Sequence, residues 1–144
     1  MKTDKHSDFI QARFSGNILD IEQIHPKRVT IAINADIIRE LAGFLYQELG
    51  LRFIIASAMQ TKAGIEIYYH FSDDTNGYIY HIHVTLPATQ PEIDSLALLF
   101  SGANWIEREM HEILGIVFRG HPEPEKLISE GNWAEGVYPY RNDQ

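Results

Sequence analysis

Cysteine is absent from this sequence of 144 residues, and its longest apolar runs are short. Without cysteine the chain has no disulfides, no thiolate-bound zinc or iron-sulfur cluster and no cysteine nucleophile. Apolar runs such as residues 96–100 are far too short to span a bilayer, and the charged N-terminus lacks the apolar core of a signal peptide. We therefore expect a cytoplasmic protein with no direct membrane span.

Basic residues are also scarce, with 12 Lys and Arg against 20 Asp and Glu, which gives a net charge of -8. Proteins that bind nucleic acid use cationic side chains to release counterions from phosphates, and anionic membrane surfaces attract polybasic segments. The charge balance therefore argues against both kinds of partner. No Gly-rich phosphate-binding loop follows a predicted strand, so nucleotide binding has no support either.

Hydrophobic residues make up 44% of the chain, which suits one globular domain, residues 1–144, with a modest core. Apolar alternation predicts a hairpin and three further strands: 18–24, 28–33, 51–61, 64–72 and 77–86. Residues 1–16 are weakly patterned and form either a short helix or a loose lead-in. Helical spacing predicts two principal helices, 35–49 and 104–114. The fold class is therefore α+β, a small, mainly antiparallel sheet with these helices and an extended C-terminal tail.

Capping residues define the ends of the second helix. Asn104 stands at a predicted N-cap, and Glu107, three residues on, completes a capping box with it. Gly115 stands where a glycine commonly ends a helix. We therefore expect Glu107 to lie in the first turn of a surface helix.

The segment after Gly115 is rich in aromatic residues but has little periodicity. Irregular backbone leaves N–H and C=O groups in need of partners, while aromatic side chains favour burial. Such a tail either packs across its own domain or lies on another protein. Trp133, Tyr140 and Arg141 are residue types that anchor interfaces, but composition alone leaves the two interpretations about equal.

Four motifs follow one another within residues 103–143: W-x-E-R-E, G-I-x-F-x-G-H-P, a downstream tryptophan and P-x-R-x-D. They comprise Trp105, Glu107, Arg108, Glu109, Gly115, Ile116, Phe118, Gly120, His121, Pro122, Trp133, Pro139, Arg141 and Asp143. Their order and spacing resemble the signature of the respiratory complex I 30 kDa subunit family, which comprises the C subunits of NADH-quinone oxidoreductase. This family includes a related subunit of membrane-bound energy-converting NiFe hydrogenases.

The resemblance implies a non-catalytic accessory subunit of a membrane-associated oxidoreductase complex, peripheral to the membrane through that complex. FMN, iron-sulfur clusters or a NiFe centre would be bound only by partner subunits, and this chain would bind no cofactor. The implied partner is a 49 kDa-type subunit or the large subunit of a NiFe hydrogenase. The implied interface residues are Trp105, Glu107, Arg108, Glu109, Phe118, His121, Pro122, Trp133, Tyr140 and Arg141. The isolated chain is a candidate homo-oligomer, because exposed aromatic surfaces rarely stay bare.

Some positions depart from the pattern of the quinone-reducing members. Glu112 and Leu114 stand where those members have Asp and Phe, and residues 123–126 lack their leucine and paired arginines. These departures favour the hydrogenase branch of the family and leave the identity of the partner open.

Histidines offer an alternative function, that of a self-contained metal-binding enzyme or module. His81 and His83 lie on one face of a predicted strand and His70 on its neighbour, so three imidazoles could hold zinc. The opposing interpretation, which we favour, is that they line a half-exposed polar face. His121 could carry protons, but the favoured role is to fix its loop by hydrogen bonding.

Overall fold

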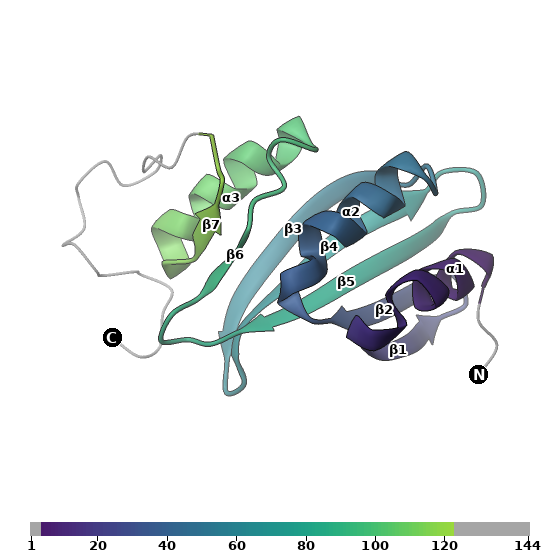
Figure 1. Ribbon diagram of the computed structural model, residues 1–144, viewed down its shortest axis with the longest axis horizontal. Coiled ribbons are helices and arrows are strands. Elements are labelled where there is room, and N and C mark those ends of the chain that lie inside the picture. The colour runs from purple at the N-terminus through teal and green to yellow at the C-terminus, as the bar shows by residue number, and fades with distance from the viewer. Residues whose placement is uncertain (1–3, 123–144) are drawn as a thin grey trace.

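The computed structural model describes residues 4–122 of the chain and confirms the predicted α+β class (Figure 1). The strands of the larger sheet are β1 (Ile18–His25), β2 (Arg28–Ile33), β3 (Arg52–Thr61), β4 (Gly64–Asp73) and β5 (Tyr78–Leu86). A second sheet contains β6 (Glu92–Asp94) and β7 (Val117–Arg119). The helices are α1 (Lys5–Phe14), α2 (Ile38–Gln47) and α3 (Ser101–Leu114), with short 3-10 turns at Ser15–Asn17 and Ala35–Ile37.

The larger sheet has the strand order β1-β2-β5-β4-β3, so β1 and β3 form its two edges. Neighbouring strands are antiparallel except β2 and β5, which are parallel. The predicted hairpin of β1 and β2 is confirmed. An Asn-Gly pair turns the chain between β4 and β5, where Gly77 has a φ of +79°.

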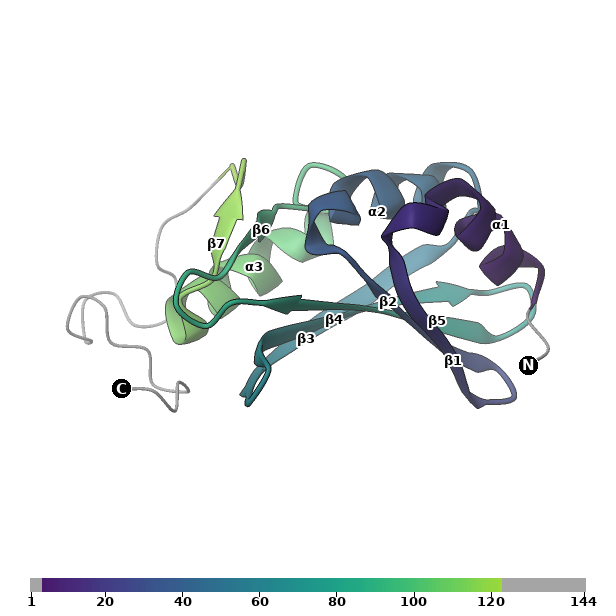
Figure 2. The same cartoon turned by 60° about the horizontal axis from the view of Figure 1, so that its bottom comes forward.

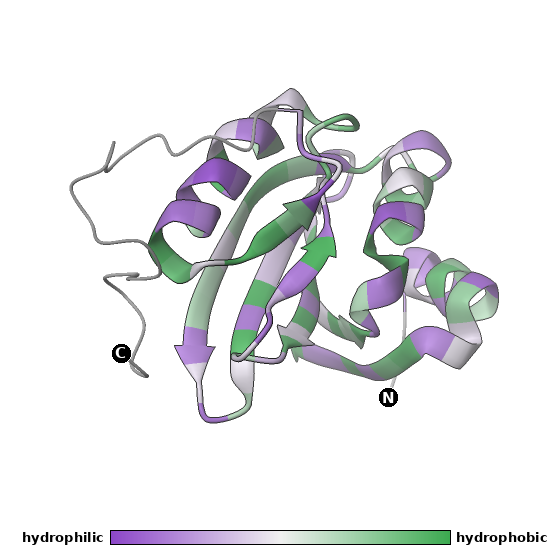
Figure 3. Cartoon of the chain, turned by 60° about the vertical axis from the view of Figure 1, so that its left-hand side comes forward, coloured by the Kyte–Doolittle hydropathy of each residue, from purple (hydrophilic) through white to green (hydrophobic). Residues whose placement is uncertain are grey.

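The core lies between one face of this sheet and helices α1 and α2, and it continues into buried residues of α3 and the second sheet (Figure 2). Hydropathy alternates along the strands, because successive side chains point to opposite faces (Figure 3). Fully buried residues from both layers include Ile10, Leu41, Leu45, Ile67, Phe71 and Ile82. No helix among residues 4–122 covers the opposite face of the sheet (Figure 2).

The starts of both predicted helices differ in detail from the sequence prediction. The segment predicted as helix 35–49 begins with a 3-10 turn at Ala35–Ile37, and α2 itself begins at Ile38. Asn34 stands at the N-cap position of this turn, but its side-chain amide donates a hydrogen bond to the Asn17 side chain instead of capping the turn. The predicted capping box of Asn104 and Glu107 is also wrong. Helix α3 begins at Ser101, so that Glu107 lies in its interior, while the predicted Gly115 cap is confirmed by a φ of +79°.

Two further elements come from segments that the sequence left undefined. Residues 5–14 form α1, with the Asp4 carboxylate accepting a hydrogen bond from the Ser7 amide at its N-terminus. The segment after Gly115, predicted to be a loop, contributes β7, which pairs in parallel with β6. Strands of three residues are too short to show alternation, so sequence periodicity could not find them.

A pair of glycine variants tests the backbone geometry of the sheet. Gly64 has a φ of +137°, and a Cβ there would collide with the carbonyl oxygen of Leu86, so Gly64→Ala should destabilise the fold by about 2–4 kcal/mol. Gly43 lies within α2 with open space around it, so Gly43→Ala should stabilise the fold by about 0.5–1 kcal/mol. Urea denaturation measures both; effects of equal sign would contradict this description.

Candidate functional site

Helix α3 divides the signature residues that it carries between two faces. Glu107 is only 2% exposed and lies on the buried face with Ala103, Met110 and Leu114. Trp105 is 57% exposed, because two residues along a helix turn the side chain by about 200°. Within one motif, Glu107 therefore points into the protein and Trp105 points away from it.

The carboxylate of Glu107 holds α3 against the segment that follows β6. Its Oε1 accepts a hydrogen bond from the Ser95 hydroxyl at 2.5 Å, and its Oε2 accepts one from the Leu96 amide at 2.7 Å. The Ser95 hydroxyl in turn accepts a hydrogen bond from the Ala97 amide. A buried carboxylate requires such donors, because nothing else replaces its lost hydration.

Ser95 extends this connection to α2 and β7. Its amide donates to the carbonyl of Arg119 at 2.9 Å, and its own carbonyl accepts two hydrogen bonds from the Arg39 guanidinium. Arg39 also donates to the Arg119 carbonyl at 3.2 Å. Sequence reasoning did not identify Ser95 or Arg39, since most of their partners are backbone groups or side chains distant in the chain.

The end of the signature loop packs against the same helix. His121 is 3% exposed at its side chain and donates from Nε2 to the carbonyl of Asn104 at 3.1 Å; this nitrogen lies 3.9 Å from Glu107 Oε1. His111 donates from Nδ1 to the carbonyl of Ile116. Phe118 is 8% exposed, so His121 and Phe118 both stabilise the loop from within.

Burial changes the acidity of Glu107. Desolvation raises its pKa from 4.5 to about 7, although the hydrogen bonds from Leu96 and Ser95 and the charge of Arg39 act in the opposite direction. The carboxyl group of Glu107 therefore titrates near neutral pH.

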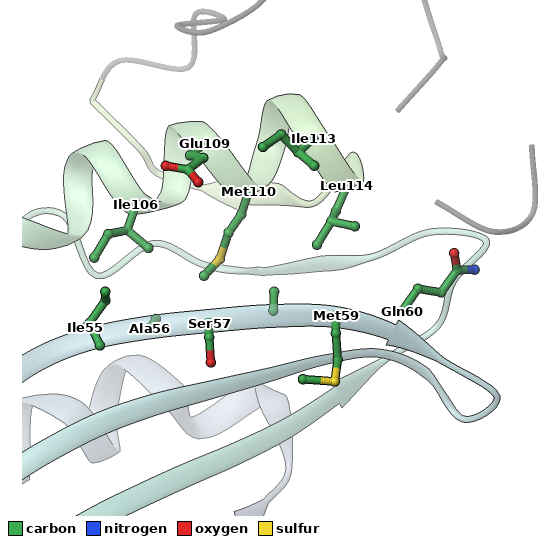
Figure 4. Close-up of a pocket in the computed structure, with 11 residues that line it drawn as sticks. Ile55, Ala56, Ser57, Met59, Gln60, Ile106, Glu109, Met110, Ile113 and Leu114 are labelled. Carbon is green, nitrogen blue, oxygen red and sulfur yellow. The ribbon is translucent and has the colours of Figure 1, made fainter. Parts of the chain in front are cut away.

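A groove of about 510 Å³ lies between α3 and the edge strand β3 (Figure 4). Its lining residues are Ile55, Ala56, Ser57, Ala58, Met59, Gln60, Ile106, Glu109, Met110, Ile113 and Leu114. Ile106, Met110 and Leu114 point from the helix toward the strand (Figure 4). The groove is thus largely apolar, and of the signature residues on α3 it is lined by Glu109.

The strand histidines do not come together as a three-imidazole site. His70 and His81 share a hydrogen bond between their Nδ1 atoms at 2.6 Å, and burial together with Arg28 lowers the pKa of each. His83 instead bonds to Glu66 at 2.6 Å and stacks on Tyr68. Within residues 4–122, no group of three or more His, Asp or Glu is arranged to hold a metal ion.

The remaining predicted interface residues are partly accessible or lie elsewhere. Glu109 is exposed, Arg108 is half-buried, and Pro122 is exposed at the end of the described segment. The predictions for Trp133, Tyr140 and Arg141 fall on residues that lie outside this segment. Of the helices formed by residues 4–122, none has both the length and the apolar character needed to cross a bilayer.

The raised pKa of Glu107 predicts a pH effect on stability. Between pH 4.5 and 7 the folded state holds a proton that the unfolded state has lost, so the free energy of unfolding should fall as pH rises through this window. Relative to Glu107→Gln, which cannot ionise, the wild type should lose up to about 3 kcal/mol between pH 4.5 and 8. Urea denaturation of both proteins across this range measures the difference; a difference that does not change with pH would contradict the prediction.

Comparison with known proteins identifies the family. The family model described as "Respiratory-chain NADH dehydrogenase, 30 Kd subunit" matches residues 31–144. The C subunit of NADH-quinone oxidoreductase from Geobacter metallireducens is 24% identical over 139 residues, which cover 93% of this chain and 84% of that protein. Hydrogenase-4 component G of Escherichia coli is 25% identical over 138 residues, which cover 93% of this chain but 25% of that protein.

A solved structure shares the fold. A chain in the structure of the membrane-bound sulfane sulfur reductase, an archaeal respiratory membrane complex, superposes with a TM-score of 0.72 at 20% identity. The superposition covers 97% of this chain and 85% of that one. Because the family model matches most of its length, the chain belongs to the 30 kDa subunit family of respiratory-chain NADH dehydrogenase.

Proposed function

We propose that the chain is a non-catalytic accessory subunit of a membrane-associated oxidoreductase complex and docks on its large catalytic subunit. The partner would be a 49 kDa-type subunit or the large subunit of a NiFe hydrogenase, and the redox cofactors would belong to partner subunits. Membership of the family supports this role, as does similarity to proteins named as an NADH-quinone oxidoreductase subunit and as a hydrogenase component. Docking would occur through the outward residues of the signature.

The exposure of Trp105 is the observation that carries the proposal. Trp105 is 57% exposed, although Ala103 and Glu107, two residues away on either side, are buried. A large aromatic residue held on a helix loses little conformational freedom on binding and buries a large area, so tryptophan is a common anchor of interfaces. Trp105 thus has the chemistry of a docking residue.

The hydrogen bonds of Glu107 and His121 support a structural role for these two residues of the signature. Glu107 accepts hydrogen bonds from Ser95 and Leu96, and His121 donates to a backbone carbonyl of α3. Their hydrogen bonds are therefore made within the chain and fix the helix and the loop. This internal bonding would present Trp105 and Glu109 to a partner on a rigid platform, which lowers the entropic cost of association.

Two departures from the quinone-reducing pattern do not distinguish between partners. Glu112 and Leu114 are 1% and 5% exposed, so their side chains act on the packing of α3 rather than on a partner. The choice between a respiratory and a hydrogenase complex therefore depends on the outward residues and on residues 123–144.

Replacing the exposed tryptophan tests the proposal. Trp105→Ala in the tagged full chain, expressed in its native cells, should lower co-purification of the large subunit at least tenfold, because an anchor of this kind contributes about 2 kcal/mol or more. Quantitative mass spectrometry measures the recovery. The thermal unfolding of the isolated variant should stay close to that of the wild type.

The matched control is Phe9→Ala. Phe9 is an exposed aromatic residue, 47% accessible, on α1 at the other end of the molecule (Figure 1). This variant should leave recovery of the large subunit unchanged. Equal recovery with Trp105→Ala and Phe9→Ala would overturn the proposed docking role of Trp105.

A further inference from the structure

The groove beside α3 runs along the open edge of strand β3. Residues 55–60 of this strand all line it, although alternate side chains of a strand point to opposite faces. Ser57 and Met59 point to the side of β3 away from α3 (Figure 4). A groove that contacts side chains on both faces of β3 must run along the edge of the strand. The backbone edge of β3 therefore forms part of the groove wall.

This edge carries little of the protection common on exposed strands. Edge strands usually avoid unwanted pairing through lysine or proline residues, and β3 has neither. Its one irregularity is the register shift between Phe53 and Ile55, before the groove begins. Ile55 and Met59 are 49% and 50% exposed beside it. An open edge flanked by exposed apolar side chains is a surface suited to pairing.

The shape of the groove determines what can occupy it. Ala56, Ser57 and Ala58 are small and leave room between the strand and the helix, where Ile106, Met110 and Ile113 provide apolar contacts. A segment paired with residues 55–60 would extend for about 20 Å, or about six residues. Backbone hydrogen bonds to β3 require an extended occupant, and the apolar lining requires apolar side chains at alternating positions.

Charge further restricts the occupant. Glu109 is the charged residue among the described residues that line the groove, and the chain as a whole carries a net charge of -8. A second copy of this chain would therefore approach against like charge, whereas a basic side chain would meet Glu109 favourably.

We propose that an extended, apolar segment of the partner polypeptide, carrying a basic residue opposite Glu109, adds to the sheet as a strand along β3. This inference rests on the proposed function, because the segment would belong to the large subunit that Trp105 contacts. Backbone pairing supplies affinity in this mode of recognition, and the side-chain pockets supply specificity.

Hydrogen exchange tests the added strand directly. The full chain is compared alone and in the complex purified from native cells, with β1, the opposite edge of the sheet, as internal control. Alternate amides of residues 54–60 should exchange at least tenfold more slowly in the complex, and those of β1 should not change. Unchanged exchange in β3 with the large subunit bound would overturn the inference and leave the proposed function standing.

Other occupants give different results, and each would overturn the inference. Protection of β3 in the isolated chain that rises with protein concentration would indicate a second copy. Protection that is independent of concentration and lost when residues 123–144 are removed would indicate the chain's own C-terminal segment. Failure to recover any large subunit with the wild-type chain would overturn both this inference and the proposed function.

A pair of lysine variants separates the edge of β3 from the rest of the interface. Ile55→Lys places a charge in the groove and should lower recovery of the large subunit at least tenfold. Leu19→Lys makes the same change on β1, at a residue that is 65% exposed, and should leave recovery unchanged. If Trp105→Ala lowers recovery but Ile55→Lys does not, docking stands and strand addition along β3 is wrong.

Discussion

The buried carboxylate of Glu107 fixes the position of α3, because it accepts hydrogen bonds from both Ser95 and Leu96. Burial of this group is costly, so these two donors and the nearby Arg39 are needed to offset part of its desolvation. Through Ser95 the same connection reaches α2 and β7, which meet at the carbonyl of Arg119. The direction of Trp105 and the width of the groove beside β3 both depend on where this carboxylate holds the helix.

The described part of the family signature therefore serves two purposes. Glu107, Phe118 and His121 stabilise the helix and its loop from inside, while Trp105 and Glu109 remain accessible. If docking occurs as proposed, the family signature describes an interface together with the support that keeps it rigid. The five-stranded sheet adds to this support, and its edge strand β3 borders the same surface.

Much of the fold could be predicted from the sequence because its signals are local. Alternation gave the five long strands to within a few residues, and Gly115 correctly marked the end of α3. The start of α3 was wrong because Glu107 has the spacing of a capping residue, whereas its true partners, Ser95 and Leu96, precede the helix. Strands β6 and β7 hold together through pairing between distant segments, which periodicity cannot report.

The candidate site was less predictable, because it depends on register and tertiary contacts. Strand alternation correctly put His81 and His83 on one face, but the register sets His81 opposite His70 and His83 opposite Tyr68. His70 bonds to His81 and His83 bonds to Glu66, so the three imidazoles do not surround one point. Arg39 carries no sequence signal, since it bonds to backbone carbonyls far along the chain, and the groove exists only once α3 lies beside β3.

The most direct test of the central claim is an inventory of what the wild-type chain carries in its native cells. The tagged chain is purified by affinity, its companions are identified by mass spectrometry, and the metal content of each separated subunit is measured. We predict recovery of a large subunit of the 49 kDa or NiFe-hydrogenase type in equal amount, with the redox metals bound by partner subunits. A chain recovered alone with stoichiometric zinc would contradict the proposed function.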